Sequence, residues 1–223
     1  MKPVYIRDDA ELQRAHLSLV GRSLHRSGWL PGTFGSVSLR SGEAVMITAG
    51  GLNKGVMDPA DTVLVDPFEG LPLSGETEWP PAETPIHLAV HRRLPDCAAV
   101  VHAHAPYSTA LATLAAGDGH IGRVVFRDLE MAKGLGSPDP RLVALPVVAN
   151  RPDVSRVADD VTLALDASAA DVPPALLVER SGILAWGRDT DEARDRLECI
   201  EELSHFLLLT GTGTAGAVTV HAR

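Results

Sequence analysis

The order of helical and extended segments is the feature that most constrains the fold of this chain. Short apolar runs typical of β-strands alternate at irregular intervals with amphipathic helical patterns along 223 residues. This order predicts an α/β architecture, with a mixed sheet flanked by helices. The chain is long enough to bury one core, and its composition does not change between its halves. We therefore expect a single domain over residues 1–223, with a core of about residues 9–209.

Apolar periodicity and turn residues set the expected bounds of each element. Helical spacing predicts helices over residues 12–24, 85–93, 106–115 and 154–165, and a last helix from about 190 to Gly211. Extended runs predict strands over residues 36–40, 44–48, 63–66, 97–103, 124–126, 142–148, 175–179 and 183–186. The first two strands flank Ser41-Gly42-Glu43 and should form a hairpin. We expect the tail, residues 212–223, to be loosely ordered.

Charge and hydropathy narrow the classes of partner. Lys and Arg number 20 against 29 Asp and Glu, and the formal net charge of -9 repels phosphate backbones and anionic membranes. Nucleic acid and membranes are therefore excluded as expected partners, whereas a small anionic substrate in a local positive pocket is compatible with this charge. The first residues, MKPVYIRDDAE, lack a secretory pattern, and no long apolar run occurs, so we expect a cytoplasmic protein. Cys97 and Cys199 are expected to be buried thiols.

Two histidines carry the clearest chemical signal in the sequence. His102 and His104 are separated by one residue at the end of an apolar strand-like run. Because side chains alternate along a strand, both imidazoles should face the same side. This geometry suits a metal ion, since neutral imidazoles are common metal ligands. On this pattern alone, a metal site and a structural pair of histidines are equally supported.

Several stretches resemble a known family in order and spacing. The segment PAETPIHLAVHRRLPDCAAVVHAHAPYSTALATL resembles the metal-binding segment of the class II aldolase/adducin family. Two further segments, GWLPGTFGSVSLR and MITAGGLNKGVMDPADTVLVD, resemble its Gly-rich loops. Two more segments resemble the methylthioribulose-1-phosphate dehydratase branch of this family. They are RDLEMAKGL, which contains an E-M-x-K-G element, and PALLVERSGILAWGRDTDEARDRLECIEELSHFLL, which contains a G-x-x-x-W-G turn. The resemblance implies a mainly antiparallel central sheet flanked by helices and a homotetramer.

The resemblance also implies roles for individual residues. It makes His102 and His104 ligands of Zn²⁺ or another divalent metal, Glu130 the acid/base carboxylate, and Glu83 an acidic residue near the metal. A substrate phosphate would lie at two Gly-rich loops, on residues Gly32, Thr33, Gly50, Gly51 and Lys54. Glycine turns let backbone N–H groups approach an anion, and a lysine adds a positive charge. Without the family, each of these loop and carboxylate residues is more often an ordinary turn or surface residue.

Two positions depart from the family pattern. Ser181 occupies the place of a third metal-binding histidine, and a neutral hydroxyl is a poor zinc ligand. The sequence therefore predicts that Glu83 or water completes the metal shell, that the metal is weakly bound, or that it is lost. Phe34 and Ser36 replace residues that are more often Gly and then Asn or Gly in the first loop. Phe34 would narrow the pocket and mark a different substrate.

Three functional hypotheses follow. The first is metal-dependent dehydration of a ketose 1-phosphate in methionine salvage, with Glu130 as the base. The second is an aldolase acting on a similar sugar phosphate, in which Glu83 is essential. The third is a repurposed or inactive family member, favoured by Ser181.

The other histidines carry weaker signals. His25, His91 and His205 are expected to be solvent-facing or core-edge residues of helices, and His87 gains some interest because it follows Glu83 by one helical turn. His16, His120 and His221 have no motif around them.

Overall fold

A computed structural model describes residues 4–116, 121–168, 173–211 and 214–217. The described strands are β1 (Ser36–Ser41), β2 (Ala44–Thr48), β3 (Thr62–Val65), β4 (Ala99–Ala103), β5 (Gly122–Arg127), β6 (Leu142–Val148), β7 (Ala175–Val178), β8 (Gly182–Gly187) and β9 (Thr214–Ala217). They form one sheet in the order β3-β2-β1-β4-β8-β7-β6-β5-β9. Neighbouring strands run antiparallel except β6 and β7, which are parallel. The predicted mixed, mainly antiparallel sheet is confirmed.

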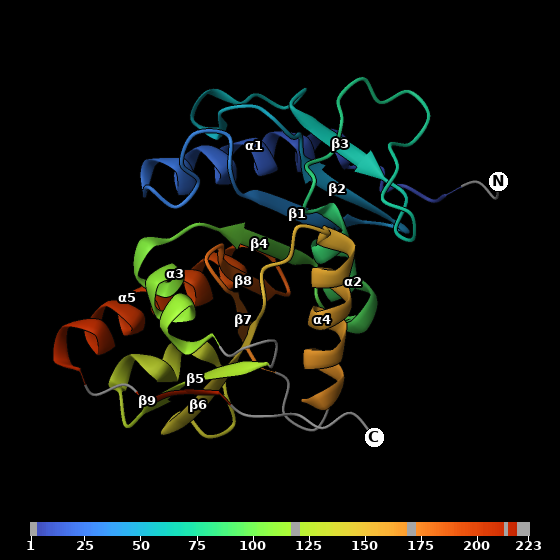
Figure 1. Ribbon diagram of the computed structural model, residues 1–223. Coiled ribbons are helices and arrows are strands. Elements are labelled where there is room, and N and C mark those ends of the chain that lie inside the picture. Colours follow the sequence, from blue (N-terminus) through green and yellow to red (C-terminus); the bar gives the residue numbers. More distant parts are fainter. Residues whose placement is uncertain (1–3, 117–120, 169–172, 212–213, 218–223) are drawn as a thin grey trace.

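Helices cover both faces of this sheet (Figure 1). The helices are α1 (Ala10–Arg26), α2 (Thr84–Arg93), α3 (Pro106–Ala115), α4 (Val154–Ala167) and α5 (Thr190–Thr210), with short 3-10 helices η1 (Lys54–Val56) and η2 (Glu130–Leu135). Buried residues of α1, α3 and α5 share one apolar core with Val101 of β4. Buried residues of α2 and α4 form a second core with Val100. Because side chains alternate along a strand, His102 lies on the same face of β4 as Val100, toward α2 and α4.

The predicted elements agree with the observed ones over most of the described chain. The hairpin of β1 and β2 pairs Ser41 with Ala44 around Gly42, which has a positive φ of 66°. The prediction of a loosely ordered tail is wrong for residues 214–217, because they form β9 and pair with β5 at the edge of the sheet. The remaining tail residues lie outside the described part of the chain. Short, Gly-containing edge strands carry little apolar periodicity, which explains the error.

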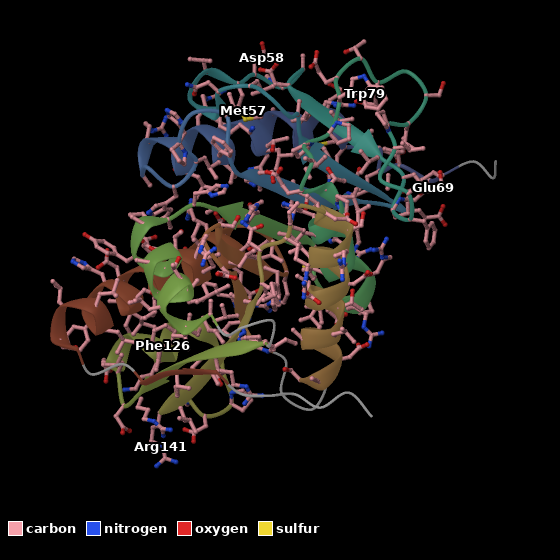
Figure 2. The ribbon with its side chains drawn as sticks, in the orientation of Figure 1. Met57, Asp58, Glu69, Trp79, Phe126 and Arg141 are labelled. Atoms are coloured by element: carbon pink, nitrogen blue, oxygen red, sulfur yellow. The ribbon has the colours of Figure 1, made fainter. Side chains whose placement is uncertain are left out.

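The side chains of the described residues, which Figure 2 draws as sticks, divide into buried and exposed sets. Phe126 of β5 is fully buried in the larger core, whereas Trp79 is exposed on the long loop before α2. Both cysteines are free thiols; Cys97 is buried and Cys199 only partly so. Burial raises the pKa of the Cys97 thiol to about 11. No helix within the described residues is long and apolar enough to cross a membrane.

A buried carboxylate holds two helices together. The Glu201 side chain of α5 accepts hydrogen bonds from the backbone N–H groups of Tyr107 and Ser108, both at 2.8 Å, at the start of α3. We expect Glu201→Gln to lower the free energy of unfolding by about 1–3 kcal/mol, because the amide leaves one buried donor unpaired. Denaturant unfolding measures this loss. Glu198→Gln, at an exposed carboxylate of the same helix, is the control, and equal stability of both variants contradicts the assignment.

Candidate functional site

The predicted metal-site residues meet in one pocket between α2, α4 and the ends of β4 and β7. The pocket has a volume of about 430 Å³, within the usual range for small-molecule sites. Its polar lining includes His102, His104, Glu83 and Ser181. Apolar walls come from residues of the first loop, α2, α4 and β7, namely Pro31, Phe34, Ala82, Ile86, Val154, Val157 and Val178. Two further polar residues, Asn150 and Arg180, also line the pocket, and neither was predicted as a site residue from the sequence.

The two histidines lie side by side, as the strand period predicts. The ring centroids of His102 and His104 are 5.0 Å apart. His102 is buried; its Nε2 lies 3.2 Å from the Ser181 Oγ, and its Nδ1 lies 3.9 Å from the Glu83 Oε1 without forming a hydrogen bond. Burial and the neighbouring His102 lower the pKa of His104 to about 4, although Glu83 acts in the opposite direction. His104 is therefore a neutral imidazole at physiological pH, the form that binds metals.

A tight turn brings Ser181 to His102 across 79 residues of sequence. Gly182 begins β8 with a φ of 149°, and a Cβ there would lie 1.9 Å from the backbone oxygen of Ala103. No larger residue fits this close approach of β8 to β4. Arg180 also has a positive φ, of 53°. The turn therefore places Ser181, the residue that the resemblance aligns with a third imidazole, beside His102.

The donor set is incomplete for a catalytic zinc ion, which usually has three protein ligands and an open position. His102 and His104 supply two imidazoles, but a hydroxyl stands at the third position. Among the residues that the structure describes, no group of three or more His, Cys, Asp and Glu side chains could hold a metal ion. The residues present therefore fit two ligands of a divalent cation rather than a closed three-ligand site.

Glu83 stands at the N-cap position of α2, where the helix dipole favours an anion. Its Oε1 accepts a hydrogen bond from the Ser36 hydroxyl at 3.1 Å. Burial alone would raise the pKa of Glu83, but the nearby His102 and His87 and the helix backbone lower it to about 2. The pocket therefore contains a fixed carboxylate beside two imidazoles. Ser36, a departure from the family pattern, is part of this arrangement.

Phe34 packs against one of the two histidines, His104. Its ring meets the His104 ring edge-on, with centroids 5.5 Å apart and an interplanar angle of 73°. The side chain is 65% exposed although it is large and apolar. The next residue, Gly35, passes close to β4, and a Cβ at this position would lie 2.9 Å from the His102 backbone oxygen. Phe34 therefore lines the pocket, and the expected narrowing stays a prediction.

The predicted phosphate residues lie in two loops that Lys54 ties together. The Lys54 Nζ donates to the backbone oxygens of Thr33 and Leu52, each at 3.2 Å, and the side chain is fully buried. Burial lowers the pKa of Lys54, while Glu83 and Asp61 raise it. The backbone at Gly32 and Gly51 is exposed, and both have positive φ. The lysine therefore joins the loops from inside, and the glycine backbone faces outward.

Glu130 does not line the pocket of its own chain. It begins η2, its side chain is 87% exposed, and its Oε1 accepts a hydrogen bond from the Lys133 Nζ at 2.7 Å. It borders a different hollow with Met131, Phe206 and Leu209, all of which are largely exposed.

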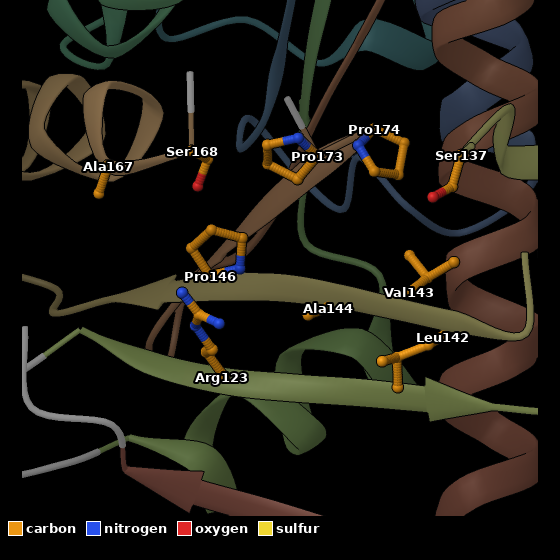
Figure 3. A pocket seen from close by; sticks show the side chains of 10 residues that line it. All are labelled: Arg123, Ser137, Leu142, Val143, Ala144, Pro146, Ala167, Ser168, Pro173 and Pro174. Carbon is orange, nitrogen blue, oxygen red and sulfur yellow. The ribbon is translucent and has the colours of Figure 1, made fainter. Parts of the chain in front are cut away.

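A third hollow, between β5, β6 and the end of α4, contains none of the predicted site residues (Figure 3).

One of the two histidines of α2 differs from expectation. His87 and His91 are both buried and hydrogen-bonded to serines of β1, so the expectation of a solvent-facing or core-edge His91 is wrong. Helical spacing alone cannot tell which polar residue faces a strand. His25 is half-buried and its ring contacts the Leu30 backbone oxygen, while His205 stacks on Tyr107. His120 and His221 lie outside the described residues.

The fold and the pocket define an α/β protein with imidazoles and a carboxylate at the end of a central strand. A family model described as the Class II Aldolase and Adducin N-terminal domain matches residues 15–208. The chain belongs to the class II aldolase/adducin family, which confirms the resemblance inferred from the motifs.

Named relatives and a solved structure agree with this assignment. The chain is 40% identical over 207 residues to a probable bifunctional methylthioribose-1-phosphate isomerase/methylthioribulose-1-phosphate dehydratase of Nocardia farcinica, covering 93% of this chain but only 37% of that protein's length. It is 34% identical over 196 residues to a methylthioribulose-1-phosphate dehydratase of Methylococcus capsulatus, covering 86% of this chain and 91% of that protein. The L-fuculose-1-phosphate aldolase structure of Thermus thermophilus has a TM-score of 0.69, 25% identity, and coverage of 90% of this chain and 96% of that chain.

Proposed function

We propose that the chain is a lyase that removes water from a ketose 1-phosphate, with methylthioribulose 1-phosphate as the favoured substrate and methionine salvage as its pathway. The observation that carries the proposal is the pocket in which His102, His104 and Glu83 meet beside the predicted phosphate loops. The similarity to proteins named as methylthioribulose-1-phosphate dehydratases supports the choice of reaction. The apolar wall of Ile86, Val154 and Val157 suits an apolar substituent such as a methylthio group.

In this reaction a base removes the proton from C3, and the C4 hydroxyl leaves as water after it receives a proton from an acid. The enol that remains then tautomerises to the diketone phosphate. A carboxylate is the natural base and acid for both transfers. The exposed glycine backbone at Gly32 and Gly51, with the charge of Lys54 behind it, would hold the phosphate and fix the reacting carbons. His102 and His104 would hold a divalent cation, whose chemistry in such a site is to polarise a carbonyl.

Glu130 is the proposed acid/base carboxylate, and its position determines how it could act. It lies outside the pocket of its own chain and next to the exposed apolar residues Met131, Phe206 and Leu209. Large exposed apolar patches mark protein contacts. We therefore place Glu130 in the pocket of a neighbouring copy within the proposed homotetramer.

A specific observation favours the alternative of a sugar-phosphate aldolase. Glu83, rather than Glu130, is the carboxylate that lines the pocket of its own chain. The fold also matches an L-fuculose-1-phosphate aldolase. The third hypothesis, a repurposed or inactive family member, is supported by the hydroxyl of Ser181 at the third ligand position.

Parallel assays separate these alternatives. The purified protein is given methylthioribulose 1-phosphate, and loss of water is followed as formation of a diketone phosphate. Carbon–carbon cleavage is followed as release of dihydroxyacetone phosphate. We expect the first product only. Release of dihydroxyacetone phosphate as the main product supports the aldolase, and the absence of both products supports the inactive member.

Metal content tests the two predicted ligands. We expect His102→Ala and His104→Ala each to abolish the zinc that the protein carries through a rapid desalting step from zinc-containing buffer, because one remaining imidazole cannot hold the ion. Mass spectrometry of the metal per chain measures this. His205→Ala, which changes an imidazole outside the pocket, should retain the native content. Unchanged metal content in both pocket variants contradicts the assignment.

A further inference from the structure

A continuous line of hydrogen bonds runs from the pocket carboxylate into the protein. The Ser36 Oγ lies 3.1 Å from the Glu83 Oε1 and 2.9 Å from the His87 Nε2. On the other side of the same ring, the His87 Nδ1 lies 2.8 Å from the Ser38 Oγ, which in turn lies 2.9 Å from the His91 Nε2. All four residues beyond Glu83 are buried. Apart from Glu83, the line uses none of the groups to which the proposed reaction assigns a role.

The spacing of strand and helix makes this line regular. Ser36 and Ser38 lie two residues apart on β1 and therefore face the same side, about 6.6 Å apart along the strand. His87 and His91 are four residues apart on α2, about 6 Å along the helix axis. The serine spacing on β1 and the histidine spacing on α2 nearly match, so each serine contacts an imidazole of α2. Ser36 also pairs with His102 in the sheet, which sets the line directly beside the pocket.

The carboxylate fixes the direction of every proton in the line. A carboxylate only accepts, so the single Ser36 proton must point to Glu83. The Ser36 oxygen then accepts from the His87 Nε2–H, which leaves the His87 Nδ1 as an acceptor for the Ser38 hydroxyl. The Ser38 oxygen accepts in turn from the His91 Nε2–H. Each hydroxyl and each neutral imidazole contributes one proton, so all four bonds are satisfied in this one arrangement.

The far end of the line agrees with this order. The arrangement leaves the His91 Nδ1 without a proton, and that atom is buried and makes no hydrogen bond. The Cys97 backbone oxygen lies near this ring and raises its pKa, but the Nδ1 atom has no partner within hydrogen-bonding geometry, and the same oxygen accepts from the Arg40 Nε at 3.3 Å. Burial lowers the pKa of both His87 and His91 to about 3, so both rings are neutral.

We propose that Ser36, His87, Ser38 and His91 form a one-directional hydrogen-bond line whose role is to aim a fixed donor at Glu83 and hold that carboxylate toward the pocket. These four are positioning residues, since they act on the site through Glu83. The donor contacts Oε1 of the carboxylate, which lines the pocket. The role in ligand binding rests on the proposed function, whereas the proton order does not.

Neutron diffraction from crystals of the perdeuterated protein tests the proton order directly. We expect deuterium on the Nε2 of His87 and His91, none on either Nδ1, and the Ser36 deuterium directed at Glu83. Deuterium on the Nδ1 of either histidine overturns the proposal. This outcome does not depend on metal or turnover, so the proposed function can fail while the line is confirmed, and the reverse also holds.

Matched serine variants test the positioning role. Ser38→Ala breaks the line without touching Glu83 and is expected to weaken zinc binding by about tenfold, as loss of an outer-shell partner does. Ser38→Thr keeps the hydroxyl and should restore the affinity. Ser41→Ala is the control, because Ser41 is a buried serine of the same strand whose hydroxyl has no hydrogen-bond partner. Equal zinc affinity of Ser38→Ala and Ser41→Ala overturns the positioning role. If Ser38→Ala does not fold, the neutron map of the native protein still decides the proton order.

Discussion

Ser181→His is expected to bind zinc at least about ten times more tightly than the native protein, because it restores an imidazole at the third ligand position. His102 lies on β4 and His104 directly follows that strand, and the Ser181 Oγ lies only 3.2 Å from the His102 Nε2. A larger side chain on the same turn therefore starts close to the His102 ring. The native protein should accordingly hold zinc weakly and turn over substrate slowly.

Competition with a fluorescent zinc chelator measures both affinities in one titration series. Ser27→His adds an imidazole at the exposed end of α1 and controls for nonspecific binding. Sub-nanomolar binding by the native protein, or no gain in Ser181→His, means that another residue completes the metal shell. Either result contradicts the equivalence of Ser181 with the missing ligand.

Glu130→Gln is expected to lower the rate of dehydration by about 100-fold or more while leaving the fold and the zinc content unchanged. The substitution removes a proton acceptor but keeps the shape of the side chain. Initial rates with methylthioribulose 1-phosphate measure the loss. If Glu83→Gln is inactive and Glu130→Gln retains full turnover, Glu130 is the wrong carboxylate and the aldolase alternative gains.

Mixing two inactive variants tests whether Glu130 acts in a neighbouring copy. Glu130→Gln and His102→Ala are unfolded and refolded together, so that mixed oligomers form. A site that joins the native His102 of one copy with the native Glu130 of the next should reappear in about a quarter of positions, by random pairing in a symmetric ring. Each variant refolded alone is the control. No recovery in the mixture contradicts a shared site.

Most of the fold follows from local sequence patterns. The order of strands and helices, the hairpin at Gly42 and the helices at both ends of the His102 segment all have apolar periodicity or turn residues that mark them. Strand β9 was missed because four small residues at a sheet edge carry no such pattern. Sheet order was also beyond local patterns, since the pairing of β4 with β8 depends on contacts between distant segments.

Some features of the candidate site could be predicted from the sequence, and others could not. The pairing of His102 with His104 follows from the strand period, whereas Glu83 was expected only from the family resemblance. The line through Ser36 and His91 could not be predicted, because it depends on the register between β1 and α2. Long-range packing also decides that Lys54 is buried between two loops rather than exposed.

The most direct test of the proposed function follows one substrate in native and pocket-deficient protein. Phosphorus NMR records methylthioribulose 1-phosphate with added zinc and the native chain, the His102→Ala/His104→Ala double variant, or Ser181→His. We predict slow conversion to the diketone phosphate by the native chain, none by the double variant and faster conversion by Ser181→His. Two results contradict the assignment of this pocket as the site of a ketose 1-phosphate dehydratase. One is that the double variant forms the diketone phosphate at the native rate, and the other is that none of the three proteins forms it.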